Sequence, residues 1–62
     1  MRINAVISEW IKNDGSLLTL ANRLDMPTAQ VSLKLSGVKA WTWEEARIVA
    51  SVIGCSLNDL AD

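Results

Sequence analysis

The sequence predicts an all-α protein that folds as one compact domain of five short helices. Apolar residues recur every three or four positions, which is the spacing of one face of a helix. Capping residues and glycines interrupt this pattern at intervals that suit short helices. The single short alternation, at residues 31–35, lies among residues that favour a helix, so no strand is predicted. With 62 residues, the chain is long enough for a single domain only, spanning residues 1–62.

The first predicted helix carries an apolar stripe near the N-terminus. The stripe follows the spacing i, i+3, i+4, i+7 and i+8, and consists of Ile3, Val6, Ile7, Trp10 and Ile11. The sequence Asn-Asp-Gly at residues 13–15 is typical of a helix end. We expect this stripe, Trp10 included, to face the core.

The second predicted helix begins after Ser16, a good N-cap residue, and runs to residue 24. Its inner stripe consists of Leu17, Leu20, Ala21 and Leu24, so that Leu18 points away from the core. Residues 25–27, Asp-Met-Pro, break the chain. Pro27 suits the first turn of the helix that follows.

The third predicted helix spans residues 28–36, with Gly37 just after its end. Val31, Leu33 and Leu35 alternate as in a strand, but the residues around them favour a helix. At about 100° per residue, Leu35 lies about 40° from Val31, and these two mark the direction of the core. Leu33 lies about 200° from Val31, so it should point outward.

The last two predicted helices are capped in similar ways. Thr42 and Glu45 form a capping box for a helix that ends at Gly54. Ser56 and Asp59 repeat this pattern for a short final helix. Apolar residues on these two helices exceed what one side can bury, namely Ile48, Val52, Leu57 and Leu60. The excess suggests a weak homodimer through the C-terminal helices.

Composition excludes several classes of function. The chain has one cysteine and no histidine, so it lacks an intramolecular disulfide, a Cys/His metal site and the commonest general base. We therefore expect no enzyme activity, no catalytic residue, no metal and no cofactor. No apolar run approaches the length of a membrane span, and the N-terminus lacks a signal-peptide pattern. These features predict a cytoplasmic protein without a membrane partner.

Charge is unevenly distributed along the chain, although the formal net charge is only −1. Up to residue 43 the basic residues are Arg2, Lys12, Arg23, Lys34 and Lys39, against Glu9, Asp14 and Asp25. After residue 43, Arg47 is the only basic residue among four acidic ones. This pattern predicts one basic face and one acidic face, or else an ordinary solvated surface.

Residues 20–37, LANRLDMPTAQVSLKLSG, have the plan of a helix-turn-helix. The matching positions are Leu20, Ala21, Val31, Ser32, Leu35 and Gly37. The ending WTWEEARIVASVIGCSLNDL adds a capped helix followed by Gly-x-Ser-Leu-x-x-Leu. With this ordered set, residues 16–61 resemble the phage repressor and Cro type of helix-turn-helix domain, a family that includes the XRE-like regulators.

The resemblance implies a lambda-repressor-like fold and a transcription regulator of a phage or prophage. Such a regulator binds double-stranded operator DNA as a two-fold dimer, with the helix at residues 28–36 in the major groove. Three positions depart from the family pattern. Asp25 stands where glycine is usual in the turn, although aspartate tolerates the left-handed conformation. Leu17 and Leu33 stand where polar or basic contacts are more usual.

The candidate DNA-binding residues lie on the outer face of residues 28–36 and beside it. They are Ser16, Thr28, Ala29, Gln30, Ser32, Leu33, Lys34, Ser36 and Lys39. A glutamine at position 30 suits an adenine edge, and Ala29 and Leu33 suit thymine methyl groups. Helix amides capped by Ser16 suit a phosphate. Lys34 and Lys39 would attract phosphates without reading bases.

A second interpretation remains open for the same residues. Leu33 could pack against the first helix or a partner, and the lysines and serines could be ordinary surface residues. The domain would then be a protein-binding helix-turn-helix, an antirepressor or modulator that holds another regulator protein through Leu17, Leu18 and Leu33. The acidic pI near 5.1 favours this alternative.

Overall fold

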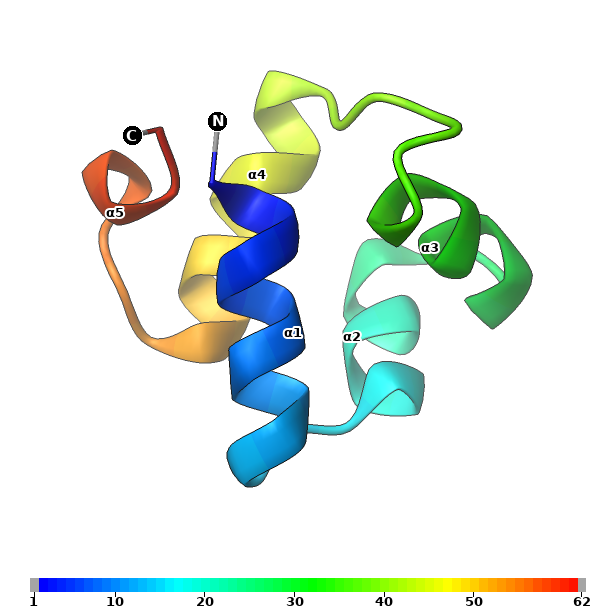
Figure 1. The fold of residues 1–62 in the computed structure, drawn as a ribbon, viewed down its shortest axis with the longest axis horizontal. Helices are drawn as coiled ribbons and strands as arrows, with labels where there is room; N and C mark the ends of the chain where they lie inside the picture. Colours follow the sequence, from blue (N-terminus) through cyan, green and yellow to red (C-terminus); the bar gives the residue numbers. More distant parts are fainter. Residues whose placement is uncertain (1, 62) are drawn as a thin grey trace.

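The computed structural model of the protein describes residues 2–61. This part of the chain forms five α-helices and no strand, as the sequence predicts. The helices are α1 (Ile3–Asn13), α2 (Leu17–Leu24), α3 (Thr28–Leu35), α4 (Trp43–Ile53) and α5 (Leu57–Ala61). In Figure 1, α1 crosses the middle of the molecule, with α4 and α5 on one side and α2 and α3 on the other.

The core lies where all five helices meet. Each helix contributes one of the largest fully buried side chains, which are Ile7, Leu20, Val31, Val49 and Leu60. Small Ala21 of α2 and Ala46 of α4 are also buried, and these two helices pack against each other. Because each helix is short, its stability depends on this shared burial more than on helix propensity.

The capping predictions are confirmed. Ser16 caps α2 by accepting a hydrogen bond from the backbone amide of Thr19 at 3.3 Å. Thr42 and Glu45 form a reciprocal capping box at the start of α4, with N···O distances of 2.9 and 3.1 Å. The hydroxyl and amide of Ser56 pair in the same way with Asp59 ahead of α5.

The turn between α2 and α3 survives without glycine. Asp25 has φ 58° and ψ 45°, in the left-handed region that aspartate tolerates, as predicted. The amide of Met26 then donates to the carbonyl of Ala21 at 3.1 Å, which closes the turn. The sequence predicts Pro27 in the first turn of α3. It instead precedes the helix as its N-cap residue, in an extended conformation. At the other end, α3 stops at Leu35, one residue before the predicted end.

Two of the three tryptophans, Trp10 and Trp41, lie at the edge of the core. Trp10 is partly buried, and its indole covers Gly15 so closely that a Cβ there would overlap the ring. Trp41 is partly buried as well, and its Nε1 donates to Asn4 Oδ1 at 2.6 Å. Trp43, at the first position of α4, is 56% exposed.

The C-terminal helices bury more of their apolar surface than the sequence suggested. Leu60 is fully buried, and its carbonyl accepts a hydrogen bond from the amide of Arg2 at 2.8 Å. Ile48, Val52 and Leu57 are partly buried against the core. The excess that predicted a dimer is thus largely used within one molecule.

Candidate nucleic-acid interface

The turn at Asp25 packs α3 on α2 and leaves the opposite side of α3 uncovered (Figure 1). Val31 is fully buried and Leu35 is partly buried, so these two residues define the inner side of α3. Residues on the other side, Thr28, Ala29, Ser32 and Ser36, are exposed. A short helix held in this way leaves one row of side chains open to a ligand.

Leu33 points outward, as its angular position predicts. Its side chain is 37% exposed, whereas Val31, two residues earlier, has no exposed surface. Two further apolar residues are exposed, Leu18 in the first turn of α2 at 62% and Val38 in the loop after α3 at 71%. The outer face of α3 therefore mixes hydroxyl groups with apolar carbon.

Lys34 is not a surface cation, which corrects the prediction that it contacts DNA. Its side chain is buried against Trp41, with Nζ 5.6 Å from the centre of the ring. Nζ donates to the carbonyl of Ala40 at 2.9 Å and pairs with Glu45 Oε1 at 3.0 Å. On a regular helix, position 34 lies about 300° from Val31, at the edge of the outer face. The long alkyl stem instead lets the ammonium reach inward between α3 and α4.

Glu45 joins this ion pair to the start of α4. Partial burial tends to raise the pKa of Glu45, but the hydrogen bond from the Thr42 amide and the bond and charge of Lys34 outweigh it. The pKa of Glu45 therefore lies below its ordinary value. The carboxylate both completes the capping box and anchors α3, so the two helices share one electrostatic contact.

Gln30 and Lys39 form a pair that the sequence did not predict. Lys39 Nζ donates to Gln30 Oε1 at 2.9 Å across nine positions of the chain. An ammonium group has only donors, so the amide oxygen of Gln30 must face it. The amide nitrogen of Gln30 is left free to donate to a ligand. No spacing rule indicates this contact, because a loop and not a helix brings the two residues together.

The loop after α3 is held by the carbonyl of Leu33. That oxygen accepts from the Ser36 hydroxyl at 2.9 Å and from the amides of Val38 and Lys39 at 3.0 and 3.3 Å. Gly37 has φ 87°, a conformation that favours glycine and lets the chain fold back along α3. The loop thus places Lys39 beside α3. Because the Ser36 hydroxyl donates its hydrogen to the Leu33 carbonyl, it would act toward a ligand mainly as an acceptor.

The start of α2 lies at the other end of the candidate interface. Ser16 is exposed and caps the helix, so the amides of Leu17 and Leu18 in the first turn keep no intrahelical partner. Leu17 is partly buried against the core, whereas Leu18 is exposed. A phosphate or an apolar partner surface would each find a matching group at this position.

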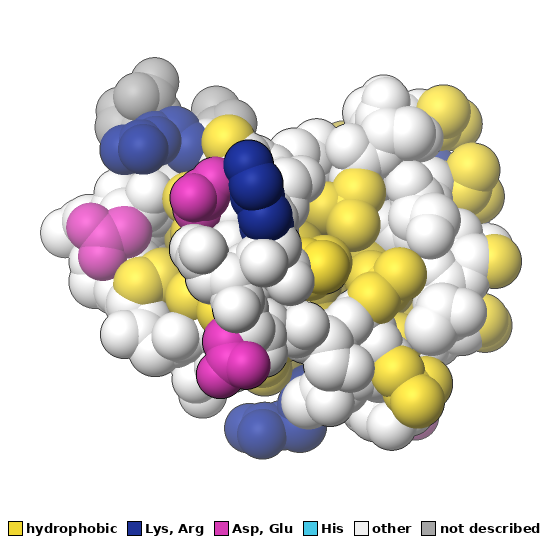
Figure 2. Space-filling view, turned by 60° about the horizontal axis from the view of Figure 1, so that its bottom comes forward, with side chains coloured by type: hydrophobic (Ala, Val, Ile, Leu, Met, Phe, Trp, Pro, Cys, Tyr) yellow, Lys and Arg dark blue, Asp and Glu magenta, His cyan; other side chains and the backbone are white. Residues whose placement is uncertain are grey.

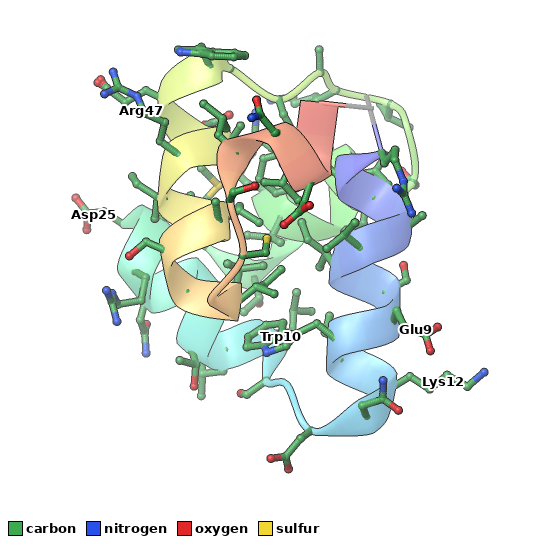
Figure 3. The ribbon with its side chains drawn as sticks, turned by 90° about the vertical axis from the view of Figure 1, so that its left-hand side faces the viewer. Glu9, Trp10, Lys12, Asp25 and Arg47 are labelled. Atoms are coloured by element: carbon green, nitrogen blue, oxygen red, sulfur yellow. The ribbon has the colours of Figure 1, made fainter. Side chains whose placement is uncertain are left out.

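The predicted basic face is weaker than expected. Lys34 is buried, and Figure 3 places Lys12 and Arg47 at opposite corners of the molecule. In Figure 2 the right-hand side, where α2 and α3 lie, is mostly neutral, and charged side chains gather on the left. Lys39 is therefore the cation that the structure places directly against the outer face of α3.

A groove of about 510 Å³ lies on a different side, between α1 and the end of α4. Val6, Trp10 and Ile53 form its apolar wall, and Glu9 lies at its margin (Figure 3). No residue of α3 lines it. The groove is therefore separate from the candidate interface.

Comparisons with protein-family models, with curated proteins and with solved structures found no match. Within residues 2–61, no three His, Cys, Asp or Glu side chains gather as they would around a metal ion. None of the helices in that part of the chain has the length and apolar character needed to cross a membrane. Cys55 is partly buried, and burial, together with the charge of Asp59, raises the pKa of its thiol.

Proposed function

We propose that this protein is a small DNA-binding transcription regulator of the phage repressor and Cro type, with α3 in the major groove of an operator. The observation that carries the proposal is the α2-turn-α3 unit, in which Asp25 closes the turn and α3 exposes one side. A helix presented in this way has the shape that the major groove accommodates.

The chemistry of the outer face is suited to base edges. Leu33 and Ala29 offer carbon to thymine methyl groups, and Ser32 can donate or accept a hydrogen bond. The free amides at the start of α2 suit a phosphate. With few cations nearby, we expect modest affinity, and sequence preference must come mainly from base contacts.

We also retain a weak homodimer as part of the proposal, because a two-fold operator requires two copies of α3. The apolar wall of Val6, Trp10 and Ile53 is open to contact and includes Ile53 of α4, one of the C-terminal helices. An apolar wall of this kind can be shared by two copies. Dimerisation would show as two protein molecules bound to each DNA duplex.

The test is fluorescence anisotropy of a labelled duplex taken from beside the gene, titrated at about 50 mM and about 150 mM salt. We expect saturable binding that prefers this duplex over a scrambled one and weakens as salt rises. Ser32→Glu should weaken binding about tenfold or more, because it sets a carboxylate against the DNA. Ser8→Glu, an exposed serine of α1, is the matched control and should bind as the wild type does.

Equal binding to native and scrambled duplexes by folded protein would contradict the proposal. It would favour the second candidate, a protein-binding helix-turn-helix that modulates another regulator. The observation behind this candidate is the exposure of Leu18, Leu33 and Val38 beside so few free cations. Binding through such a surface should be insensitive to salt.

A further inference from the structure

We propose that Lys39 determines which base Gln30 reads, and that the pair selects guanine where a free glutamine would select adenine. The inference rests on the proposed function, because it concerns the same surface of α3. It reverses the sequence-based expectation that Gln30 contacts adenine and that Lys39 only attracts phosphates.

The geometry of the pair leads to this inference. Lys39 Nζ lies 2.9 Å from Gln30 Oε1. The backbone of Lys39 is fixed as well, since its amide donates to the Leu33 carbonyl at 3.3 Å. Gly37, with φ 87°, is the residue that turns the chain back to this position. The fold of the loop therefore places the backbone of Lys39 where its side chain reaches Gln30.

The chemical consequence follows from what each base presents in the major groove. Adenine offers an acceptor, N7, and a donor, the N6 amino group. A paired contact with adenine therefore uses both the amide nitrogen and the amide oxygen of Gln30. In this protein the ammonium of Lys39 takes one of the two lone pairs of that oxygen and sets a positive donor group beside the position of the N6 amino group, which is also a donor. Guanine offers two adjacent acceptors, O6 and N7. The free amide nitrogen of Gln30 and the remaining donors of Lys39 match that edge.

The experiment is selection of bound duplexes from a randomised library by the wild type, Gln30→Ala, Lys39→Met and Lys12→Met. The position at which Gln30→Ala loses its preference identifies the base that Gln30 reads. There the wild type should prefer guanine over adenine by about tenfold. Lys39→Met should lower that ratio to near one or reverse it. Lys12→Met removes the same charge from an exposed site on α1 and should keep the guanine preference.

The outcomes separate this inference from the proposed function. Enrichment of no sequence by the folded wild type would overturn both. A selected operator in which the Gln30 position prefers adenine, or keeps its guanine preference in Lys39→Met, would overturn the inference alone. An equal change in Lys12→Met would also overturn it, because the effect would then be one of net charge. Helical circular dichroism of each variant establishes that it is folded.

Discussion

At the scale of single residues, two lysines with similar neighbours in the sequence differ in burial and in the partners of their ammonium groups. Lys34 is buried with its ammonium on Glu45 and the Ala40 carbonyl, whereas Lys39 is exposed with its ammonium on Gln30. The difference lies in what each side chain can reach. Lys34 reaches the carboxylate of Glu45 at the start of α4, and Lys39 reaches the amide oxygen of Gln30 in α3. Lys34 thus holds α3 against the start of α4, and Lys39 lies on the surface of α3.

Replacing Lys34 by methionine should destabilise the fold by about 1–3 kcal/mol near pH 7, because Glu45 loses the partner of a buried ion pair. The lowered pKa of Glu45 means that its ionised form stabilises the folded state above the unfolded-state pKa. This contribution is lost as pH falls through the folded-state pKa. The difference between wild type and Lys34→Met should therefore shrink below about pH 5.

Urea unfolding at several pH values, followed by circular dichroism, measures this difference. Lys12→Met is the control, since Lys12 is exposed and should change the free energy of unfolding little. A gap between wild type and Lys34→Met that stays constant down to pH 3 would show that the ion pair does not stabilise the fold.

At the scale of helices, the caps determine where each element begins. Segments of five to eleven residues are too short to be stable helices alone. Three of them start at a serine or threonine whose oxygen accepts a backbone amide three residues later. The start of α4 has a second function, because Glu45 of its capping box also holds Lys34 of α3.

Thr42→Ala should lower the free energy of unfolding by about 1 kcal/mol, since the Glu45 amide loses its side-chain acceptor. Thr19→Ala in the first turn of α2 is the matched control, because alanine is a better helix former there. Denaturant midpoints of the two variants give the comparison. If Thr42→Ala is as stable as Thr19→Ala, the capping box contributes nothing measurable.

At the scale of the whole molecule, the two ends of the chain close the core together. The amide of Arg2 donates to the carbonyl of Leu60, and Leu60 is fully buried. A domain of this size has few kcal/mol of stability to lose. The short last helix is therefore part of the fold, and the exposed side of α3 depends on a core that α5 completes.

Leu60→Ala should cost about 2–5 kcal/mol, the range for removing a buried leucine side chain. A loss of that size would leave much of the protein unfolded at 25 °C. Leu18→Ala, with its side chain 62% exposed in the wild type, should change stability by less than about 0.5 kcal/mol. Thermal melts of both variants test this, and equal melting temperatures would contradict the role given to Leu60.

The sequence by itself determined the five helices, the side-chain caps of α2, α4 and α5, the turn at Asp25 and the outward direction of Leu33. All of these depend on interactions within about four positions of the chain, where spacing and residue type decide the outcome. The tertiary structure alone decided that Lys34 turns inward, that Lys39 meets Gln30 and that α5 buries Leu60. These contacts depend on how loops fold and helices pack, because long flexible side chains choose partners that only the assembled molecule brings within reach.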